Sequence, residues 1–287
     1  MVEIIAHRGA RSIAPENSLA AARLAWEMGA HRWETDVNLT RDMQLVLFHD
    51  KTLSRCTNAP ALFGYQILEE SGESADEGGP SPRKEDTLIH YTLAELAALD
   101  LGSVFLSTDP FSTIAQGRIK EQSLSDFKGE SIPTLEQGLI LTRDLNFQIN
   151  IELKDHKNEP EPFFLAGKTL EIVKGTGIPL EKVTISSFNH GWLNWVGQRA
   201  PEVETQALVG RIDDLPLDFK DFSFATYNVR AKLITEVGIQ ELKDRGKKVN
   251  IFTVNDPHEF NRFVNAGVDG IITDFPQRFA KKNRFIR

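Results

Sequence analysis

The chain alternates along most of its length between short apolar or β-rich runs and longer segments of helical character. Eight runs have the composition of strands, at residues 3–6, 32–37, 148–153, 182–186, 205–209, 222–227, 249–254 and 268–273. Segments typical of helices lie between several of them, at residues 18–28, 135–144, 163–174, 234–245 and 259–266. A repeated strand-helix order favours a parallel sheet covered by helices, and eight such units favour a closed barrel. We therefore expect an α/β fold, a TIM (β/α)8 barrel.

The length and the charge of the chain restrict its organisation and its partners. A barrel of this type commonly takes about 250 residues, so residues 1–287 fit a single domain with an insertion. Charged residues make up 26% of the chain, and no apolar stretch approaches the roughly 20 residues that span a bilayer, so we expect no stable membrane insertion. The formal net charge of −8 argues against a nonspecific nucleic-acid binder. A phosphate-bearing ligand would have to be held locally, by a cation or a few basic groups.

Cysteine usage and the first residues bear on the compartment. Cys56 is the only cysteine, which leaves no intramolecular disulfide and no cysteine-based zinc site. The first nine residues have no basic stretch followed by a long apolar one, as a signal peptide would. We therefore expect a cytoplasmic protein.

Residues 51–131 interrupt the alternation and are expected to form a small cap module inserted after the second strand. Within them, residues 69–86 are rich in Glu, Ser, Gly and Pro and predict a mobile acidic loop. Residues 91–99 predict a short amphipathic helix, with Thr92 and Glu95 at the spacing of a capping box. Just before this insertion, residues 38–48 are expected to form a hairpin that brings His49 near the level of Asp36.

Polar side chains gather at the predicted strand ends. Glu34 and Asp36 lie two apart on the second strand, and so do Glu152 and Lys154 on the third, so each pair shares a face. Carboxylates that converge at a barrel mouth repel each other unless a hard cation or a shared proton compensates, and Mg²⁺ or Ca²⁺ suits such oxygen ligands. His7 and its neighbours at the end of the first strand add a titratable group and a cation. The mouth at the carboxyl ends of the strands is where barrels carry active sites.

An ordered set of motifs resembles glycerophosphodiester phosphodiesterases over nearly the whole chain. The set comprises His7-Arg8-Gly9, Ala14-Pro15-Glu16-Asn17-Ser18, Glu34-Thr35-Asp36-Val37, Thr40-Arg41-Asp42, Phe48-His49-Asp50, Thr52-Leu53-Ser54-Arg55, Leu93-Ala94-Glu95-Leu96, Ile132-Pro133-Thr134-Leu135-Glu136, Ile151-Glu152-Leu153-Lys154, Ile185-Ser186-Ser187-Phe188, Thr253-Val254-Asn255 and Asp269-Gly270-Ile271-Ile272-Thr273-Asp274. The resemblance implies a TIM barrel with a small inserted module that hydrolyses glycerophosphodiesters to glycerol 3-phosphate and an alcohol.

The resemblance also implies a role for each matching residue. Glu34, Asp36 and Glu152 would bind one divalent metal ion, Mg²⁺ or Ca²⁺. His7 and His49 would be the acid/base pair, and Arg8 and Lys154 would hold phosphate oxygens. Which histidine is the acid, and whether water or the glycerol 2-hydroxyl attacks first, stays open.

One departure from the family pattern concerns the substrate side of the site. The family usually has a tryptophan before the Thr-Val-Asn run, where this chain has Phe252, so an aromatic contact with the substrate can persist but an indole hydrogen bond cannot. Two rival interpretations stay open at this stage. One is a related barrel phosphodiesterase that acts on lysophospholipids, of the lysophospholipase D type. The other is a non-catalytic barrel that binds phosphorylated metabolites.

Overall fold

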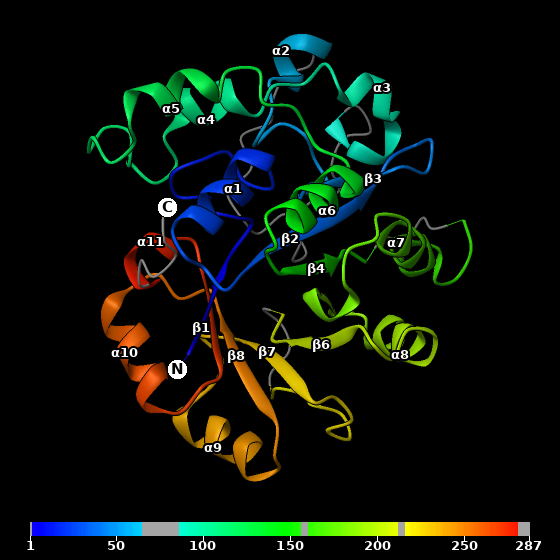
Figure 1. The fold of residues 1–287 in the computed structure, drawn as a ribbon, viewed down its shortest axis with the longest axis vertical. Coiled ribbons are helices and arrows are strands. Elements are labelled where there is room, and N and C mark those ends of the chain that lie inside the picture. Colours follow the sequence, from blue (N-terminus) through cyan, green and yellow to red (C-terminus); the bar gives the residue numbers. More distant parts are fainter. Residues whose placement is uncertain (1, 65–85, 156–159, 212–215, 281–287) are drawn as a thin grey trace.

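A computed structural model describes residues 2–64, 86–155, 160–211 and 216–280 of the chain. Eight parallel strands form a closed barrel, because β1 pairs with β9 on one side and with β2 on the other (Figure 1). In barrel order these strands are β1 (Glu3–Ala6), β2 (Arg32–Leu39), β4 (Ile149–Leu153), β5 (Val183–Ser187), β6 (Glu204–Val209), β7 (Thr226–Arg230), β8 (Lys248–Phe252) and β9 (Gly270–Thr273). The TIM-barrel prediction is confirmed.

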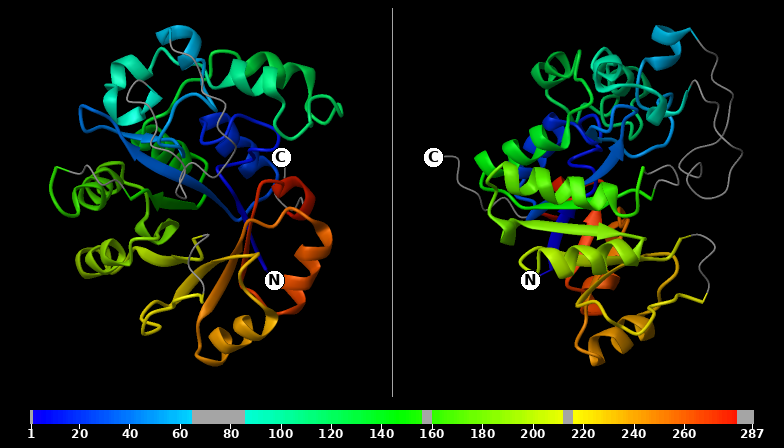
Figure 2. Two further views of the ribbon diagram at one scale, coloured as in Figure 1. Left: turned by 180° about the vertical axis from the view of Figure 1, so that it is seen from behind. Right: turned by 90° about the vertical axis from the view of Figure 1, so that its right-hand side faces the viewer.

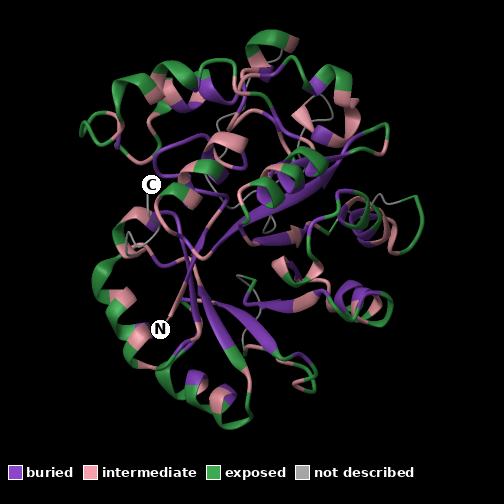
Figure 3. Cartoon of the chain, viewed as in Figure 1, coloured by how far each residue is buried: buried purple, intermediate pink, exposed green. Residues whose placement is uncertain are grey.

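Helices cover the outside of the barrel, as the two turned views show (Figure 2). They are α1 (Leu19–Glu27), α6 (Leu135–Asp144), α7 (Phe164–Gly175), α8 (His190–Arg199), α9 (Glu236–Asp244), α10 (Pro257–Asn265) and α11 (Pro276–Phe279), with a 3₁₀ turn, η4 (Leu180–Lys182), before β5. Their outer faces are exposed, whereas the strands are buried along most of their length (Figure 3). The connection from β6 to β7 contains no helix in its described residues, 210–211 and 216–225. Within the described parts of the chain, no helix is both long and apolar enough to cross a bilayer.

The second strand shows how alternation positions the site. All eight residues of β2 are buried, because its two faces serve different purposes. Trp33 and Val37 belong to the main hydrophobic core, and the Trp33 indole N–H donates a hydrogen bond to Thr142 Oγ1 in α6 at 2.9 Å. Glu34 and Asp36 point to the other face, into the barrel. Glu34 and Asp36 therefore share a face of the strand, as their spacing predicts.

The hairpin expected at residues 38–48 is also present. The short strand β3 (Leu45–Leu47) pairs antiparallel with the end of β2, and Val37 lies opposite Leu47. The Phe48 N–H then donates a hydrogen bond to Asp36 O at 3.0 Å. This bond brings the next residue, His49, to the level of Asp36, as expected.

The strand expected at residues 222–227 is wrong by about four positions, since β7 covers Thr226–Arg230. Phe222 has a φ of 56°, which a strand residue cannot adopt, and its N–H donates to Phe219 O in a turn. The aromatic residues before β7 instead form a cluster, in which Phe219 stacks on Phe222 and contacts Tyr227 edge-on. Apolar aromatic composition favoured a strand here, but these rings pack on the outside of the barrel wall.

The segment between β3 and α6 contains α2 (Ala59–Phe63), a 3₁₀ turn η3 (Leu88–His90), α3 (Leu93–Leu96), α4 (Gly102–Thr108) and α5 (Glu121–Asp126). Many of its apolar residues form a small core with Val46 and Phe48, and its Phe105 and Phe127 pack in another cluster with Ala14 and Ala21. The capping box of Thr92 and Glu95 is present, although the helix is shorter than predicted. Asp86 is hydrogen-bonded to Leu53 and Ser54, and residues 69–85 of the expected acidic loop lie outside the described residues. That residues 51–131 act as an inserted cap module stays a prediction.

Gly9, in the loop that carries His7 and Arg8, gives a stability prediction. It has a φ of +77°, and a Cβ there would lie 2.7 Å from the Ala21 backbone in α1. Gly9→Ala should therefore lower the free energy of unfolding by about 3 kcal/mol, from a backbone cost of about 1–2 kcal/mol and a similar cost of overpacking. Urea unfolding measures the change.

Gly64 offers a matched control for this substitution. Its φ is +72°, but no atom lies within 4 Å of an added Cβ. Gly64→Ala should show only the backbone cost of about 1–2 kcal/mol. Equal losses in the two variants would show that contact with α1 does not restrict residue 9.

Candidate active site

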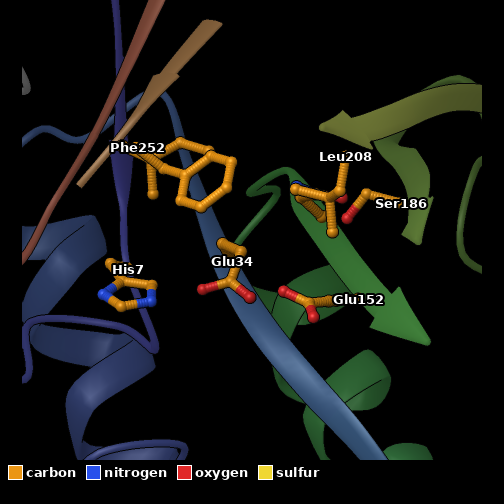
Figure 4. A pocket seen from close by; sticks show the side chains of 8 residues that line it. His7, Glu34, Glu152, Ser186, Leu208 and Phe252 are labelled. Carbon is orange, nitrogen blue, oxygen red and sulfur yellow. The ribbon is translucent and has the colours of Figure 1, made fainter. Parts of the chain in front are cut away.

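The polar residues expected at the strand ends meet at one mouth of the barrel. His7 follows β1, Asp36 lies in β2, and Glu152 and Lys154 lie at the end of β4. In the paired register Asp36 is opposite Glu152 and Glu34 is opposite Asn150. Figure 4 shows Glu34 and Glu152 with their carboxylates toward each other, and His7 across from them.

Three carboxylates form an acidic cluster at this mouth. One oxygen from each of Glu34, Asp36 and Glu152 lies within 4.8 Å of the others. Burial raises the pKa of Glu34 well above its usual value, and the negative charges of Asp36 and Glu152 raise it further. Glu34 Oε2 accepts a hydrogen bond from the Arg8 backbone N–H at 2.9 Å, whereas its buried Oε1 has no hydrogen-bond partner in the described residues. The cluster therefore offers only oxygen ligands, and one of them, Glu34 Oε1, is buried without a hydrogen-bond partner among the described residues. Such a set fits a hard divalent cation such as Mg²⁺ or Ca²⁺.

Two cationic side chains border the acidic cluster. Lys154 Nζ lies 2.9 Å from Asp36 Oδ1 and 2.6 Å from Glu152 Oε1. Arg8 Nε lies 3.4 Å from Asp36 Oδ2, and its Nη1 donates to Glu16 at 2.9 Å. Burial alone would raise the pKa of Asp36, but the positive charges around it, Lys154 foremost, hold this pKa well below its usual range. Asp36 is thus ionised at neutral pH and placed between two cations.

His7 is held by an acidic partner. Its Nδ1 lies 2.6 Å from Asp274 Oδ1, and the side chain of His7 is 16% exposed. Asp274 also accepts a hydrogen bond from Asn255 Nδ2 at 2.6 Å and lies 3.4 Å from Arg11. Burial would raise the pKa of Asp274, but Arg11 and His7 lower it well below its usual value, so it is a carboxylate that accepts from the ring. This bond directs Nε2 of His7 away from Asp274, and His7 lines the pocket.

His49 has a similar arrangement. Its Nδ1 lies 2.6 Å from Asp50 Oδ1, and Arg55 contacts the other oxygen of Asp50. Arg55 also contacts Glu16, which binds Arg8 as well. His49 lies close enough to Asp36 to influence the pKa of that carboxyl. Each of the two predicted catalytic histidines is therefore oriented through Nδ1 by an aspartate.

Asn17 fixes the position of Asp36. Its Nδ2 donates to Asp36 Oδ2 at 2.9 Å, and its Oδ1 accepts from the Asp36 backbone N–H and the Thr35 hydroxyl. Ser18, rather than Asn17, caps α1 through the Ala21 N–H. Asn17 therefore supports Asp36 and does not cap the helix.

Phe252 lies at the end of β8 and lines the same pocket as His7, Glu34 and Glu152. Its ring contacts Phe188 edge-on at 6.2 Å between centroids. The remaining lining residues, which sequence reasoning did not assign to the site, are Asn150, Ser186, Leu208 and Ile272. The pocket thus joins the acidic cluster to an apolar wall.

Sequence reasoning also missed the partners that orient the site, Asp50, Asp274, Arg11 and Arg55. Asp50 follows His49 directly and Asp274 ends a matched motif, so their positions in the sequence were a signal. Arg55 likewise ends a matched motif, whereas Arg11 had no such signal, because its contacts depend on how distant segments fold together.

Comparisons with known proteins agree with this arrangement. The model of the glycerophosphoryl diester phosphodiesterase family matches residues 7–278. A glycerophosphodiester phosphodiesterase of Caldanaerobacter subterraneus is 30% identical over 96% of this chain and 94% of its own. A phosphodiesterase of Oleispira antarctica, solved with the product sn-glycerol-3-phosphate, is 26% identical, with a TM-score of 0.72 and coverage of 96% and 94%. The glycerophosphodiester phosphodiesterase of Agrobacterium tumefaciens is 25% identical, with a TM-score of 0.67 and coverage of 98% and 99%.

The fold, the site and these likenesses define an enzyme class, the TIM-barrel phosphoric diester hydrolases. The chain belongs to the glycerophosphoryl diester phosphodiesterase family.

Proposed function

We propose that this enzyme hydrolyses glycerophosphodiesters to glycerol 3-phosphate and an alcohol, with one divalent metal ion and two histidines. The observation that carries the proposal is the convergence of Glu34, Asp36 and Glu152 within 4.8 Å, with two cations at their border. A phosphodiester is negatively charged, so the three carboxylates and the net charge of −8 would both repel it. A cation held by the three acids would reverse the local charge.

Glu34, Asp36 and Glu152 are the proposed ligands of the metal, Mg²⁺ or Ca²⁺. When bound, such an ion supplies Lewis-acid stabilisation of the charge on the phosphate oxygens. Arg8 and Lys154 are the proposed contacts for those oxygens. Arg8 has a buried guanidinium whose position is fixed by Glu16. The Lys154 ammonium has three N–H donors, so it can contact Asp36 and a phosphate oxygen at the same time.

His7 and His49 are the proposed proton carriers. Each ring is held through Nδ1 by an aspartate, which leaves Nε2 to exchange a proton with the substrate or the attacking oxygen. One would accept a proton from the nucleophile, and the other would donate to the leaving alcohol, which otherwise departs as a poor alkoxide. Phe252 is the proposed aromatic contact on the substrate side.

The experiment that tests this function measures the release of glycerol 3-phosphate from glycerophosphocholine, glycerophosphoethanolamine and glycerophosphoglycerol, with and without EDTA. Lysophosphatidylcholine serves as a fourth substrate for the rival lysophospholipase D activity, which is followed by the release of choline because this cleavage leaves lysophosphatidate and no glycerol 3-phosphate. We expect release from at least one of the three glycerophosphodiesters and little from the lipid. Turnover of the lipid alone would favour the rival, and turnover of none would refute the proposal.

Asp274→Asn tests the proposed role of His7. Burial and the charge of Arg8 lower the pKa of His7, and the negative charge of Asp274 opposes them. Removing this charge destabilises the imidazolium, so the His7 pKa should fall. The limb of the kcat/KM profile that reports His7 should then move to lower pH, and kcat should drop roughly 10-fold to 100-fold, as for other residues that orient a functional imidazole. An unchanged pH profile would contradict the assignment of His7.

The proposed ligand class, partners and cellular location follow the expectations from the sequence. We infer a small-molecule substrate, no nucleic-acid partner and a cytoplasmic location, the last from the single cysteine and the composition. The Oleispira relative was solved with a small-molecule product, which supports the first of these.

A further inference from the structure

Two polar side chains in the floor of the active-site pocket have no role in the proposed reaction. Asn150 lies in β4, two residues before Glu152, and Ser186 lies in β5. In the barrel register Asn150 is opposite Glu34, and Ser186 is opposite Glu152. Both side chains line the pocket together with these two carboxylates. Figure 4 shows Ser186 beside Leu208, on the far side of the acidic residues from His7.

Both side chains are buried and lack partners among the described residues. Each is 1% exposed, and neither the amide oxygen and nitrogen of Asn150 nor the hydroxyl of Ser186 has a hydrogen-bond partner there. An unsatisfied buried donor or acceptor costs about 1–3 kcal/mol. Three such atoms in one pocket wall therefore point to a ligand that bonds them. Glu34 Oε1 is a fourth polar atom of the same kind in this lining.

Elsewhere in the barrel interior, buried amides form hydrogen bonds with one another. On the opposite side of the barrel wall, Asn250 donates to Asn228 Oδ1 at 2.8 Å and to Gln206 Oε1 at 3.3 Å. At the other end of the barrel, Arg32 contacts Glu3 and Glu204. Asn228 keeps one hydrogen bond through Oδ1, although its Nδ2 has no partner among the described residues, whereas Asn150 has none at either polar atom and lines the pocket.

The pocket has room for a small group with both hydrogen-bonding functions. Its volume is about 20 Å³, and about 10–15 Å³ is enough for one water-sized group with two to four polar partners. A metal cation does not satisfy an amide N–H, and the oxygens of a phosphodiester cannot donate to the amide oxygen of Asn150. A hydroxyl suits the wall best, because it can donate to a carboxylate or amide oxygen and accept from an N–H or O–H.

We propose that Asn150 and Ser186 form a hydroxyl-binding floor of the active site, which selects for the glycerol half of the substrate. This inference rests on the proposed function. Two sources supply the same chemistry: a hydroxyl of the substrate's glycerol, or a water molecule bound permanently beside the acidic cluster. Phe252 and Leu208 in the same lining would contact the carbon atoms between the hydroxyls.

The test uses competitive inhibition of the metal-loaded full chain, which needs no turnover of the inhibitor. The probes are glycerol 3-phosphate and its two monodeoxy analogues, one without the terminal hydroxyl and one without the 2-hydroxyl. The variants are Asn150→Leu and Ser186→Ala. If the floor binds a substrate hydroxyl, each variant should bind glycerol 3-phosphate about tenfold more weakly, the equivalent of one good hydrogen bond. The analogue that lacks the recognised hydroxyl should bind wild type and variants equally.

Melting temperature in the absence of ligand separates the second source from the first. If a permanent water occupies the floor, both variants should melt lower while their inhibition constants for all three probes stay those of wild type, a result that would overturn selection for the glycerol half. Thr169→Val is the matched control, because Thr169 in α7 has a buried hydroxyl without a partner among the described residues but lies outside the pocket. It should leave inhibition unchanged.

The proposal is overturned if the probes inhibit Asn150→Leu and Ser186→Ala as strongly as wild type, and if both variants melt at the wild-type temperature or higher. That result would mean that the polar atoms bind nothing, because removing an unsatisfied polar group is neutral or stabilising. Failure of the proposed function is a separate result: wild type would then release no glycerol 3-phosphate from any glycerophosphodiester. The melting comparison remains informative in that case.

Discussion

Replacing His7 or His49 by alanine should lower kcat on a glycerophosphodiester by roughly 10² to 10⁴, the contribution of a positioned proton transfer. Each ring is oriented by an aspartate oxygen 2.6 Å from Nδ1. A water molecule in place of the ring would lack this fixed orientation and could not transfer the proton as well. The fold should be retained, because both side chains lie at the rim of the barrel, with 16% and 14% exposure. Circular dichroism and thermal melting check this point, and steady-state kinetics gives kcat.

The two losses should not add. If the histidines work in one constellation, the double variant should be little worse than the poorer single variant. A diester with a nitrophenyl leaving group hardly needs a general acid, so it should restore the rate only in the variant that lacks the acid. This comparison assigns the two roles, which the structure treats alike.

An exposed histidine provides the control for these substitutions. His258 lies at the start of α10, outside the pocket, and His258→Ala should leave kcat unchanged. A folded, metal-loaded His7→Ala or His49→Ala enzyme with nearly wild-type kcat would place that histidine among the structural residues.

Removing divalent metal should abolish turnover, and Mg²⁺ or Ca²⁺ should restore it. Without a cation, the acidic cluster of Glu34, Asp36 and Glu152 repels a phosphodiester, and Arg8 and Lys154 are partly engaged in neutralising it. Lewis-acid stabilisation by an ion is worth several kcal/mol of the barrier, or about 10³-fold or more in rate. Activity is measured after EDTA treatment and after titration with each metal.

A second measurement tests the metal ligands without relying on turnover. Metal that binds the folded state raises the melting temperature, so Mg²⁺ or Ca²⁺ should stabilise the wild type. This gain should be lost in Glu34→Gln and Glu152→Gln but kept in Glu241→Gln, which removes an exposed carboxylate on α9. Full activity in enzyme shown by elemental analysis to be metal-free would end the metal assignment.

The positions of the site residues on each strand were predictable, because they depend on local periodicity. Side chains two apart on a strand share a face, so Glu34 with Asp36 and Glu152 with Lys154 could be placed at the barrel mouth from spacing alone. The hairpin that lifts His49 to Asp36 followed from turn chemistry at residues 39–44. Where composition was ambiguous, as at residues 222–227, the prediction placed the strand too early because aromatic packing decided the local conformation.

The sequence by itself determined the parallel barrel, the strand-end acids and histidines, and the family that they resemble, since these depend on spacing along the chain. Only the tertiary structure decided which groups orient them. Asp274 reaches His7 across 267 positions, and Arg55 reaches Glu16 across 39. It also decided that Asn150 and Ser186 lack partners, because a buried polar atom is satisfied or left unsatisfied by neighbours on other strands. Barrel closure fixes those neighbours, and no local pattern in the sequence records them.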